Sequence, residues 1–358
     1  MMAVRYVWCW IALCSLLVLS GCGKEPLYQE QGFVFGTLVE ISIYGESEIH
    51  AKQAVADVMH EFQRLHNSLH AWQPSELSAL NTAFANGETR VVSPELAAML
   101  QDAAQLSKQS QGLFNPAIGG LVQVWGFHAD EFKPVQPDES LVAQWVASNP
   151  QMSDLVIGAS DSSSDKGGLG GVAVFSNNKA VQLDLGGYAK GYALDRAAAI
   201  LYLRGIHHAL INIGGNIIAL GQHGERPWRV GIQHPRQSGA LATLELHDGE
   251  AIGTSGDYQR YFMLGGRRYC HLIDPKSGHP VQGVQAVTVL THGTRAGVLS
   301  DVASKPLFVA GARGWRAAAD RMGLNDAMLV DAQGAIHLTR TMQKRLEFSD
   351  KKLRLQVE

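Results

Sequence analysis

The sequence predicts an α+β fold, a single mixed domain in which strands and helices interleave. Stretches of alternating apolar and polar residues, typical of strands, occur together with stretches whose apolar residues recur at helical spacing. The two kinds of segment do not follow the strict strand–helix–strand order of a parallel α/β sheet. With 358 residues, of which 46% are hydrophobic, the chain is long enough to bury a large core.

The first half of the chain contains one predicted strand and two predicted helices. Val39, Ile41 and Ile43 alternate with polar residues and predict a half-buried strand over 37–44. Apolar residues at helical spacing predict an amphipathic helix over 54–69. A second helix is expected to begin at Ser93-Pro94, because serine caps a helix and proline suits its first position. The Ser-, Asp- and Gly-rich residues 159–171 predict an exposed loop.

The second half is richer in predicted strands. A short strand is expected at 181–185 and a helix at 192–203, which Gly205 is placed to end. Residues 210–220 predict a strand that Gly214-Gly215 interrupts. Further strands are predicted at 228–232, 241–246, 268–273 and 284–290, a helix at 298–310 that Pro306 bends, and a closing hairpin at 327–331 and 335–338.

The charge balance and the glycine content narrow the class of function. The chain has 30 basic and 33 acidic residues and a formal net charge of −3. A nucleic-acid-binding protein normally shows a clear basic excess, so we expect no nucleic-acid partner. Its 38 glycines make up about a tenth of the 358 residues, whereas glycine usually makes up about 7% of a protein. Their clusters indicate backbone that turns sharply or approaches a ligand closely.

The N-terminal residues are predicted to form a segment separate from the folded domain. Arg5 precedes an apolar run of the length of a signal-peptide core, and the run ends in Leu19-Ser20-Gly21-Cys22. This ending resembles the lipobox of bacterial lipoproteins, which implies cleavage before Cys22, lipidation of Cys22 (palmitate included) and attachment to a bilayer. The alternative is an ordinary signal peptide with an incidental cysteine. We predict a signal peptide at 1–21, a lipidated cysteine and tether at 22–32, and the domain at 33–350.

The strongest local motif runs from Asp184 to Gly191. An acidic residue, two glycines and the start of a predicted helix follow one another there. Backbone N–H groups at a helix start favour phosphate, and Lys190 would add a positive charge. Taken alone, the motif is also consistent with a purely structural turn.

His271 and Asp301 are two further candidates near predicted turns and helix starts. A histidine between a strand and a turn is placed where loops present catalytic groups, but it is as often a structural residue. Asp301 opens a predicted helix, where it serves either as a cap or as a ligand for a hard metal ion.

Several short motifs, in a fixed order along the chain, resemble the ApbE family of FAD:protein FMN transferases. The resemblance extends from about residue 33 to the closing hairpin. It implies an ApbE-like fold and an enzyme that moves FMN from FAD onto a Thr or Ser hydroxyl of an acceptor protein, through a phosphoester bond and with release of AMP. The motifs are Phe35-Gly36-Thr37, Ser75 to Asn81, Gly112 to Pro116, Asp184 to Tyr192, Thr254 to Tyr258, His271 to Pro275, and the Asp301 segment.

The resemblance also implies roles for individual residues. His271 lies by the flavin and is implicated in transfer, and Asp301 is assigned both to catalysis and to Mg²⁺. The backbone carbonyl of Gly187 is the second implied magnesium ligand. The residues implied to bind FAD are Phe35, Trp72, Leu113, Phe114, Asn115, Asp184, Lys190 and Leu272.

The sequence departs from the family pattern at several of these positions. Phe35 replaces a usual Met, Asn115 a usual Asp, and Asn216 a common Asp. The largest departure is Lys305, at the position of a Thr that ligates the metal, because a protonated lysine has only donors. Three alternatives follow: Mg²⁺ is held by Asp301, Gly187, water and the diphosphate; the Lys305 ammonium partly replaces the cation; or catalysis is weakened.

Two other functions stay open beside the transferase. One is a flavin-binding lipoprotein with weak or no transferase activity, and the other is a FAD pyrophosphatase in which water replaces the acceptor. For the transferase, the resemblance implies acceptor proteins such as subunits of membrane redox complexes or periplasmic flavoproteins. It also implies a lipoprotein facing the periplasm, on either the inner or the outer membrane.

Overall fold

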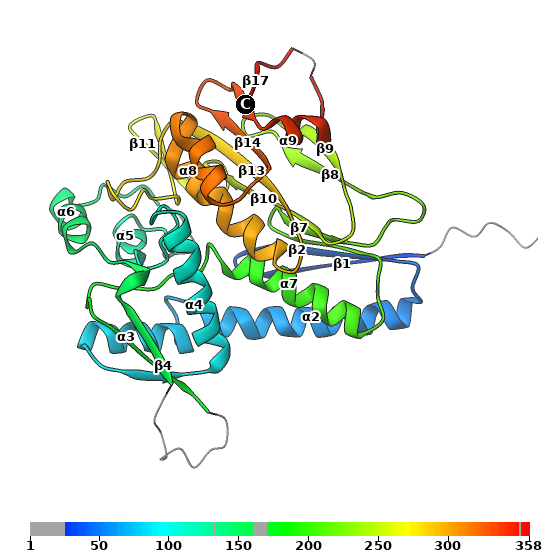
Figure 1. The fold of residues 1–358 in the computed structure, drawn as a ribbon. Coiled ribbons are helices and arrows are strands. Elements are labelled where there is room, and N and C mark those ends of the chain that lie inside the picture. Colours follow the sequence, from blue (N-terminus) through cyan, green and yellow to red (C-terminus); the bar gives the residue numbers. More distant parts are fainter. Residues whose placement is uncertain (1–25, 130, 132, 160–169, 351) are drawn as a thin grey trace, which may run out of the picture.

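The computed structural model describes residues 26–129, 131, 133–159, 170–350 and 352–358 (Figure 1). Its centre is a nine-stranded sheet whose neighbouring strands are antiparallel except for the last pair, which is parallel. In spatial order the strands are β1 (Leu27–Val34), β2 (Thr37–Tyr44), β6 (Ala209–Ile213), β7 (Asn216–Leu220), β10 (Glu250–Gly256), β13 (Val284–His292), β14 (Asp326–Asp331), β15 (Ile336–Leu338) and β17 (Leu355–Val357).

Three helices cover one face of this sheet: α2 (Glu48–Leu69), α7 (Ala189–Leu203) and α8 (Ala296–Arg321). Helix α7 lies between the other two and packs on both (Figure 1). Ser47 caps α2 by accepting a hydrogen bond from the His50 backbone N–H. Helix α8 contains Pro306 and is broken at Gly311, where φ is +67° and ψ is −179°. Its first part, before the break, is the part that carries Asp301.

A smaller sheet covers the opposite face. Its strands, in the order β16 (Glu347–Phe348), β9 (Ala240–Leu246) and β8 (Trp228–Gln233), share a second hydrophobic core with the central strands and with α9 (Arg340–Arg345). The two faces of β10 are therefore distinct: Ala251 belongs to the core under the helices and Ile252 to the core under the small sheet. By the same alternation Gly253 and Ser255 face α8, and Thr254 faces the small sheet.

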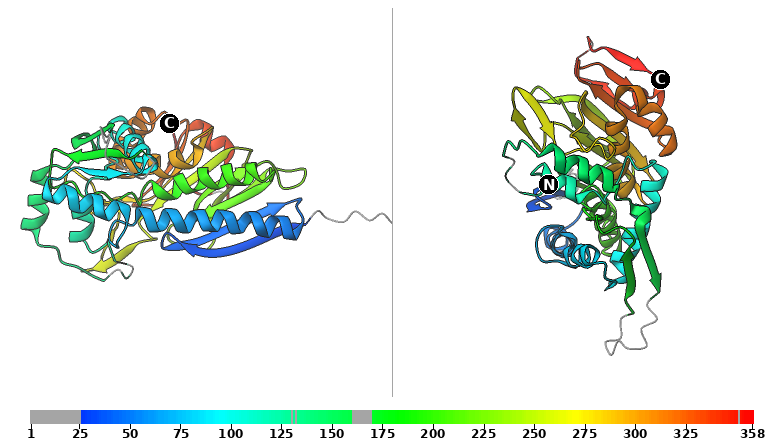
Figure 2. Two further views of the ribbon diagram at one scale, coloured as in Figure 1. Left: turned by 90° about the horizontal axis from the view of Figure 1, so that it is seen from below. Right: turned by 90° about the vertical axis from the view of Figure 1, so that its left-hand side faces the viewer.

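The remaining elements form a lobe beside the helix layer (Figures 1 and 2). A third core packs the β11–β12 hairpin against α5 and α6 through Trp125, Phe127, Val142 and Phe262. The elements of the lobe are α3 (Glu76–Asn86), β3 (Arg90–Val92), α4 (Pro94–Gln109), α5 (Gly119–Val124), α6 (Glu139–Ser148), the 3₁₀ turn η1 (Met152–Asp154), β4 (Leu155–Ala159), β5 (Val172–Ser176), β11 (Tyr261–Leu264) and β12 (Arg267–Cys270).

The α+β prediction is confirmed, and several predicted elements occur within a few residues of their expected bounds. The strand over 37–44 is β2, the helix at Ser93-Pro94 is α4 with Ser93 as its cap, and the closing hairpin is β14–β15. The strand over 210–220 is the β6–β7 hairpin, which turns at Gly214-Gly215 with both φ angles positive.

Three predicted elements need correction. Residues 181–185 form no strand; Gln182 makes an isolated bridge with Ile118. The strand expected at 268–273 ends at Cys270, so His271 lies in the loop that follows. The helix expected at 298–310 extends from Ala296 to Arg321 across the break at Gly311. Of the predicted loop at 159–171, residues 160–169 lie outside the described residues.

The predicted signal peptide and Cys22 also lie outside the described residues. The predicted tether is too long, because β1 already pairs with β2 from Leu27. At the other end, β17 extends the ordered sheet to Val357, beyond the predicted limit at residue 350. Within the described ranges, none of the helices combines the length and the apolar character needed to cross a bilayer. Cys270 is buried, and it makes no disulfide within the part of the chain that the structure describes.

Candidate functional site

The turn that begins α7 is the backbone centre of the site. The Asp184 backbone N–H donates to the Pro116 carbonyl, and the Gly186 N–H donates to the Asp184 carboxylate at 2.8 Å. Asn81 holds the residue before Asp184 from both sides: its amide donates to the Leu183 carbonyl at 2.9 Å, and its amide oxygen accepts from the Leu183 N–H at 2.7 Å. The residue before α7, Tyr188, makes no capping hydrogen bond with its side chain. The fixed turn thus presents Gly186 and Gly187 next to the start of a helix.

Asp301 is the buried charge of the site, with 1% of its surface exposed. One carboxylate oxygen accepts from the Gly191 N–H at 2.9 Å, which ties α8 to the first turn of α7. The other oxygen lies 2.7 Å from Lys305 Nζ and 3.7 Å from Lys190 Nζ. Burial alone raises the pKa of Asp301, but the two ammonium groups and the Gly191 N–H outweigh it and lower the pKa below its usual value. The carboxylate is therefore ionised and fully paired.

The Lys305 side chain lies over Gly187. A Cβ atom added at Gly187 would be 2.6 Å from Lys305 Cε and 3.7 Å from Nζ. The ammonium donates to the Asp301 backbone carbonyl at 2.6 Å as well as to its carboxylate. Burial lowers the pKa of Lys305, and the contact with Asp301 opposes that shift. The ammonium thus lies between the two residues that the resemblance assigns to the metal.

These residues do not fit a magnesium ion as they are arranged. Both carboxylate oxygens of Asp301 are already bonded to N–H donors, and Lys305 offers no lone pair while it is protonated. Mg²⁺ prefers oxygen ligands at about 2.0–2.1 Å in a near-octahedral set. Among the described residues, no group of three or more His, Cys, Asp or Glu side chains is arranged to hold a metal ion.

His271 follows β12 and is fixed by the loop that leads into the β11–β12 hairpin. Its backbone N–H donates to the Arg260 carbonyl at 3.0 Å, and its ring Nδ1 lies 3.3 Å from the same oxygen. Nδ1 therefore carries the proton and Nε2 is the acceptor nitrogen. Burial lowers the pKa of His271 to about 3, and the positive charges of Arg260, Lys190 and Lys305 add to this effect. The imidazole is neutral at physiological pH.

Aromatic residues connect His271 to the predicted flavin contacts. The His271 ring lies edge-on to Phe127 at 6.4 Å, and the next residue, His128, lies 5.5 Å from the Trp72 ring. The Trp72 backbone N–H donates to the His70 ring nitrogen, and His70 in turn packs against His66.

Phe35, at the tip of the β1–β2 hairpin, contacts His66, which also packs against His70. The Phe35 ring is 5.9 Å from His66 and 6.0 Å from Phe62. Phe35 and Gly36 form a two-residue turn with both φ angles positive, which is unusual for a bulky residue and costs about 1–2 kcal/mol. A series of ring contacts thus runs from Phe35 through His66 and His70 toward Trp72, and from Trp72 through His128 and Phe127 to His271.

Several other residues predicted to contact FAD have packing or hydrogen-bonding roles within the fold. Phe114 and Leu272 are buried in the main core. The Asn115 amide donates to the Pro150 carbonyl, and its oxygen accepts from the Ala117 N–H. Leu113 precedes them at the end of a turn that follows α4. Their roles in flavin binding stay predictions.

Two acidic residues of the motifs, Asp257 and Asp274, are held by other contacts. Asp257 forms a bidentate pair with Arg236 at 2.6 and 2.7 Å and also contacts Arg268 at 3.3 Å. Asp274 accepts from the Lys276 N–H inside a tight turn. Both act as structural residues in this arrangement.

A cavity of about 230 Å³ lies on the opposite face of the central sheet from Asp301. Thr254 and Ile252 line it, and these are the residues of β10 that face the small sheet. Tyr258 also lines the cavity, and its buried hydroxyl has no hydrogen-bond partner among the described residues. The cavity is smaller than the ~300–1,000 Å³ of typical cofactor sites.

Close glycine contacts between α7 and α8 are a feature that the sequence analysis missed. A Cβ at Gly191 would lie 2.4 Å from the Gly297 carbonyl oxygen and 2.8 Å from Asp301 Cβ. A Cβ at Gly297 would lie 2.5 Å from the Gly191 carbonyl oxygen. Only paired glycines let the two helices approach this closely. Nothing local in the sequence identifies the pair, because each glycine is required by a residue about a hundred positions away.

Replacing Gly191 by Ala is expected to destabilise the fold and to displace Asp301. Overpacking of this kind costs about 1–3 kcal/mol. Urea denaturation measures the loss, and AMP release from FAD measures the effect on the site. Gly158→Ala is the matched control, because its added Cβ meets nothing within 4 Å. Equal stability of the two variants would contradict the close packing.

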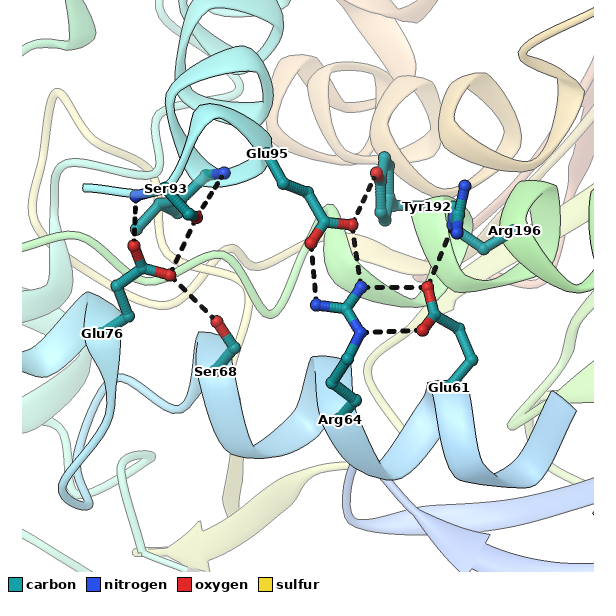
Figure 3. A network of polar contacts seen from close by, with 9 residues as sticks. Glu61, Arg64, Ser68, Glu76, Ser93, Glu95, Tyr192 and Arg196 are labelled. Carbon is teal, nitrogen blue, oxygen red and sulfur yellow. Dashed lines mark hydrogen bonds and ion pairs between the residues drawn. The ribbon is translucent and has the colours of Figure 1, made fainter. Parts of the chain in front are cut away.

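An ion-pair network fixes α7 from its other side (Figure 3). Glu61 of α2 accepts from Arg64 at 2.8 and 2.9 Å and from Arg196 of α7 at 3.0 Å. Arg64 also donates to Glu95 of α4, which accepts from the Tyr192 hydroxyl. Hydrogen bonds from Arg64 lower the pKa of Glu61 to about 2 against the opposing effect of burial, and Arg196 adds to the lowering.

Glu61→Gln is expected to lower the free energy of unfolding by about 2 kcal/mol at pH 7, since it leaves the Arg196 guanidinium without its carboxylate. The pKa of Glu61 is lowered on folding, so its contribution is full above about pH 4.5 and is lost as the pH falls toward 2. The difference between wild type and variant in urea denaturation should therefore shrink over that range. The exposed pair of Glu347 with Arg229 provides the control, and Glu347→Gln should cost less than about 1 kcal/mol at either pH.

Comparison with known proteins places this chain among characterised relatives. The model of the ApbE family matches residues 35–329. A FAD:protein FMN transferase of Rhodobacter capsulatus is 42% identical over 342 residues, covering 94% of this chain and 62% of that protein, so the chain spans less than two thirds of that relative's length. A FAD:protein FMN transferase of Treponema pallidum is 31% identical over 290 residues, covering 75% of this chain and 76% of the relative.

Solved structures agree with the sequence comparison. The crystal structure of the ApbE protein of Thermotoga maritima has a TM-score of 0.78 at 27% identity and covers 89% of this chain and 99% of its own. The apo form of the Pseudomonas stutzeri flavinyl transferase ApbE has a TM-score of 0.76 at 25% identity, with 91% and 98% covered. The resemblance that the sequence motifs carry is thus confirmed over most of the chain, and the chain belongs to the ApbE family.

Proposed function

We propose that this chain is a FAD:protein FMN transferase that moves FMN from FAD onto a Thr or Ser hydroxyl of an acceptor protein. The observation that carries the proposal is the pair of lysines at the turn that begins α7. There Lys190 and Lys305 flank Gly186-Gly187, and their charges are felt by the His271 ring. An anionic diphosphate is the ligand that such a turn favours. The names of the relatives support FAD as the diphosphate compound.

The reaction is a displacement at phosphorus. The acceptor hydroxyl oxygen attacks the FMN-side phosphorus of FAD, the new P–O bond forms, and the P–O bond to the AMP phosphate breaks. AMP leaves with that electron pair, and the hydroxyl loses its proton. Catalysis of this type depends mostly on positioning and on neutralising charge on the phosphate oxygens. Lys190, Lys305 and the start of α7 supply positive charge at the site.

His271 orients the acceptor hydroxyl in this proposal. Its Nδ1–H is directed at the Arg260 carbonyl, so Nε2 is available to accept the hydroxyl hydrogen bond. Because its pKa is about 3, the ring holds a proton only weakly and releases it to water. Asp301 acts through the two ammonium groups and the Gly191 N–H that it holds, and it is therefore a positioning residue.

The test uses the full chain in detergent with FAD and a Thr-bearing acceptor protein. The expected products are AMP and an acceptor whose flavin fluorescence survives denaturation. Free FMN formed without an acceptor, at a rate similar to transfer, would favour a FAD pyrophosphatase instead. Intact FAD bound to the purified protein, with neither product formed, would favour a flavin-binding protein without transferase activity.

Trp72→Ala is expected to weaken FAD binding without unfolding the protein. Trp72 is partly buried and packs against His128 beside the turn that caps α3, and stacking of a flat ring on an aromatic side chain contributes about 1–3 kcal/mol. The dissociation constant of FAD, measured by quenching of its fluorescence, should rise about 10- to 100-fold. The exposed Tyr202 provides the control, and Tyr202→Ala should leave FAD binding unchanged. Equal binding by both variants would remove Trp72 from the site.

We further propose that the chain is a lipoprotein anchored through Cys22 on the periplasmic side of a membrane, and that its acceptors are membrane redox subunits or periplasmic flavoproteins. The lipobox-like residues 19–22 support this proposal. Leu27 is five residues beyond Cys22, and at ~3.5 Å per residue this length reaches at most about 18 Å, which keeps the start of β1 near the bilayer. Cys22→Ser should move the protein from the membrane fraction to the soluble periplasmic fraction. An unchanged membrane fraction would remove the anchor.

A further inference from the structure

The Lys305 ammonium has one donor left for a ligand. Of its three N–H donors, one bonds the Asp301 carbonyl at 2.6 Å and another the Asp301 carboxylate at 2.7 Å. The rest of the side chain lies across Gly187, and only 15% of it is exposed. The third donor therefore remains for a group bound at the Gly186-Gly187 turn. The lysine is held in one place by its own helix, four residues from its partner.

Positive charge is already present beside Asp301 before any substrate binds, because two ammonium groups, Lys305 and Lys190, lie next to this one carboxylate. The Asp184 carboxylate, which accepts from the Gly186 N–H, offsets the second ammonium group. The helix start of α7 adds a partial positive charge. A diphosphate oxygen placed here would accept a hydrogen bond from an ammonium whose position is fixed in advance.

A divalent cation has no comparable place here. To bind Asp301 it would approach to about 2 Å from an oxygen that lies 2.7 Å from Lys305 Nζ, so the two cations would repel each other at close range. The lysine would have to leave, exposing its buried stem and breaking both hydrogen bonds to Asp301. Each of these changes opposes metal binding.

We propose that Lys305 is the resident cation of this site and that flavinyl transfer by this chain needs no divalent metal. The proposal rests on the proposed transferase function for its activity, but its metal-binding part stands apart from it. The Lys305 ammonium donates to a non-bridging oxygen of the FAD diphosphate, where it neutralises the charge that develops as AMP leaves. Asp301 keeps the ammonium protonated and aimed at that oxygen.

The experiment compares wild type, Lys305→Thr and Lys305→Met in the full chain, with Lys52→Thr on the exposed face of α2 as the control. AMP release from FAD is measured with excess chelator and with Mg²⁺. Wild type and Lys52→Thr should be active to within twofold in both conditions. Lys305→Met should lose about 100-fold in both, a typical loss for one donor at a developing charge. Lys305→Thr should be inactive with chelator and recover with Mg²⁺.

A second readout does not depend on activity. Mn²⁺ is titrated into each protein in the presence of FAD, and bound Mn²⁺ is measured by electron paramagnetic resonance against FAD alone. Wild type should hold no more Mn²⁺ than free FAD does, whereas Lys305→Thr should bind about one equivalent. Tight Mn²⁺ binding by wild type, or loss of its AMP release in chelator, would overturn the proposal. If no variant releases AMP in any condition, the transferase proposal fails, while Mn²⁺ binding still decides the role of Lys305.

Discussion

Asp301→Asn is expected to abolish flavinyl transfer and to lower the free energy of unfolding by about 3–5 kcal/mol. The change keeps the shape of the side chain but removes the charge that faces two ammonium groups. It leaves the Lys305 ammonium buried without a counter-ion, which costs more than the loss of an exposed ion pair. The released ammonium no longer lies over Gly187 in a fixed position. Urea denaturation and AMP release from FAD measure the two effects.

Two further variants show whether the buried pair causes the loss. Adding Lys305→Met to Asp301→Asn removes the unpaired charge, so the double variant should be more stable than the single one but remain inactive. Asp320→Asn breaks an exposed pair with Arg316 at the same i,i+4 spacing on the same helix, and it should cost about 0.3–0.5 kcal/mol. If Asp301→Asn costs no more than Asp320→Asn, the carboxylate does not hold the ammonium groups as described.

The sequence predicts best those elements whose apolar pattern has one interpretation. The strand over 37–44 is β2 at the same bounds, because alternation of Val39, Ile41 and Ile43 buries one face against the helices. Residues 181–185 alternate in the same way, and Val181, Leu183 and Leu185 are buried, yet they form no strand. Their backbone is bonded to the Pro116 and Ala117 carbonyls and to the Asn81 side chain. Alternation shows an extended, half-buried backbone but not its hydrogen-bond partner.

In the site, too, contacts between residues close in sequence can be predicted, whereas contacts between distant segments cannot. Helical spacing already brings Lys305 to Asp301, since they are four residues apart on α8. That the same lysine crosses Gly187 depends on how closely α7 and α8 approach, and this approach is set by the pair Gly191 and Gly297. The neutral state of His271 likewise depends first on burial of the ring, which lowers its pKa, and then on the charges of three separate segments. Such long-range contacts leave no mark on the sequence near the residues they control.

His271→Ala is expected to lower kcat about 100-fold, while the dissociation constant of FAD changes little. General-base assistance contributes about 10²–10⁴-fold, and a ring with a pKa of about 3 lies at the low end because it binds protons weakly. The remaining Lys190 and Lys305 still bind the diphosphate. Single-turnover formation of flavinylated acceptor measures the chemical step, and fluorescence quenching measures FAD binding. His247 is exposed at the end of β9, so His247→Ala provides the control and should behave as wild type.

The pH dependence separates this role from that of an ordinary histidine base. A group whose pKa is lowered on folding stays neutral as the pH falls, so His271 keeps its acceptor nitrogen down to about pH 4. The value of kcat/KM, which reports the free enzyme, should therefore show no inflection near pH 6.5 between pH 5 and 8. A tenfold fall across that range in wild type, absent in His271→Ala, would mean that the imidazole titrates normally. In that case the ring is not buried as described, and the charges of Arg260, Lys190 and Lys305 do not lower its pKa.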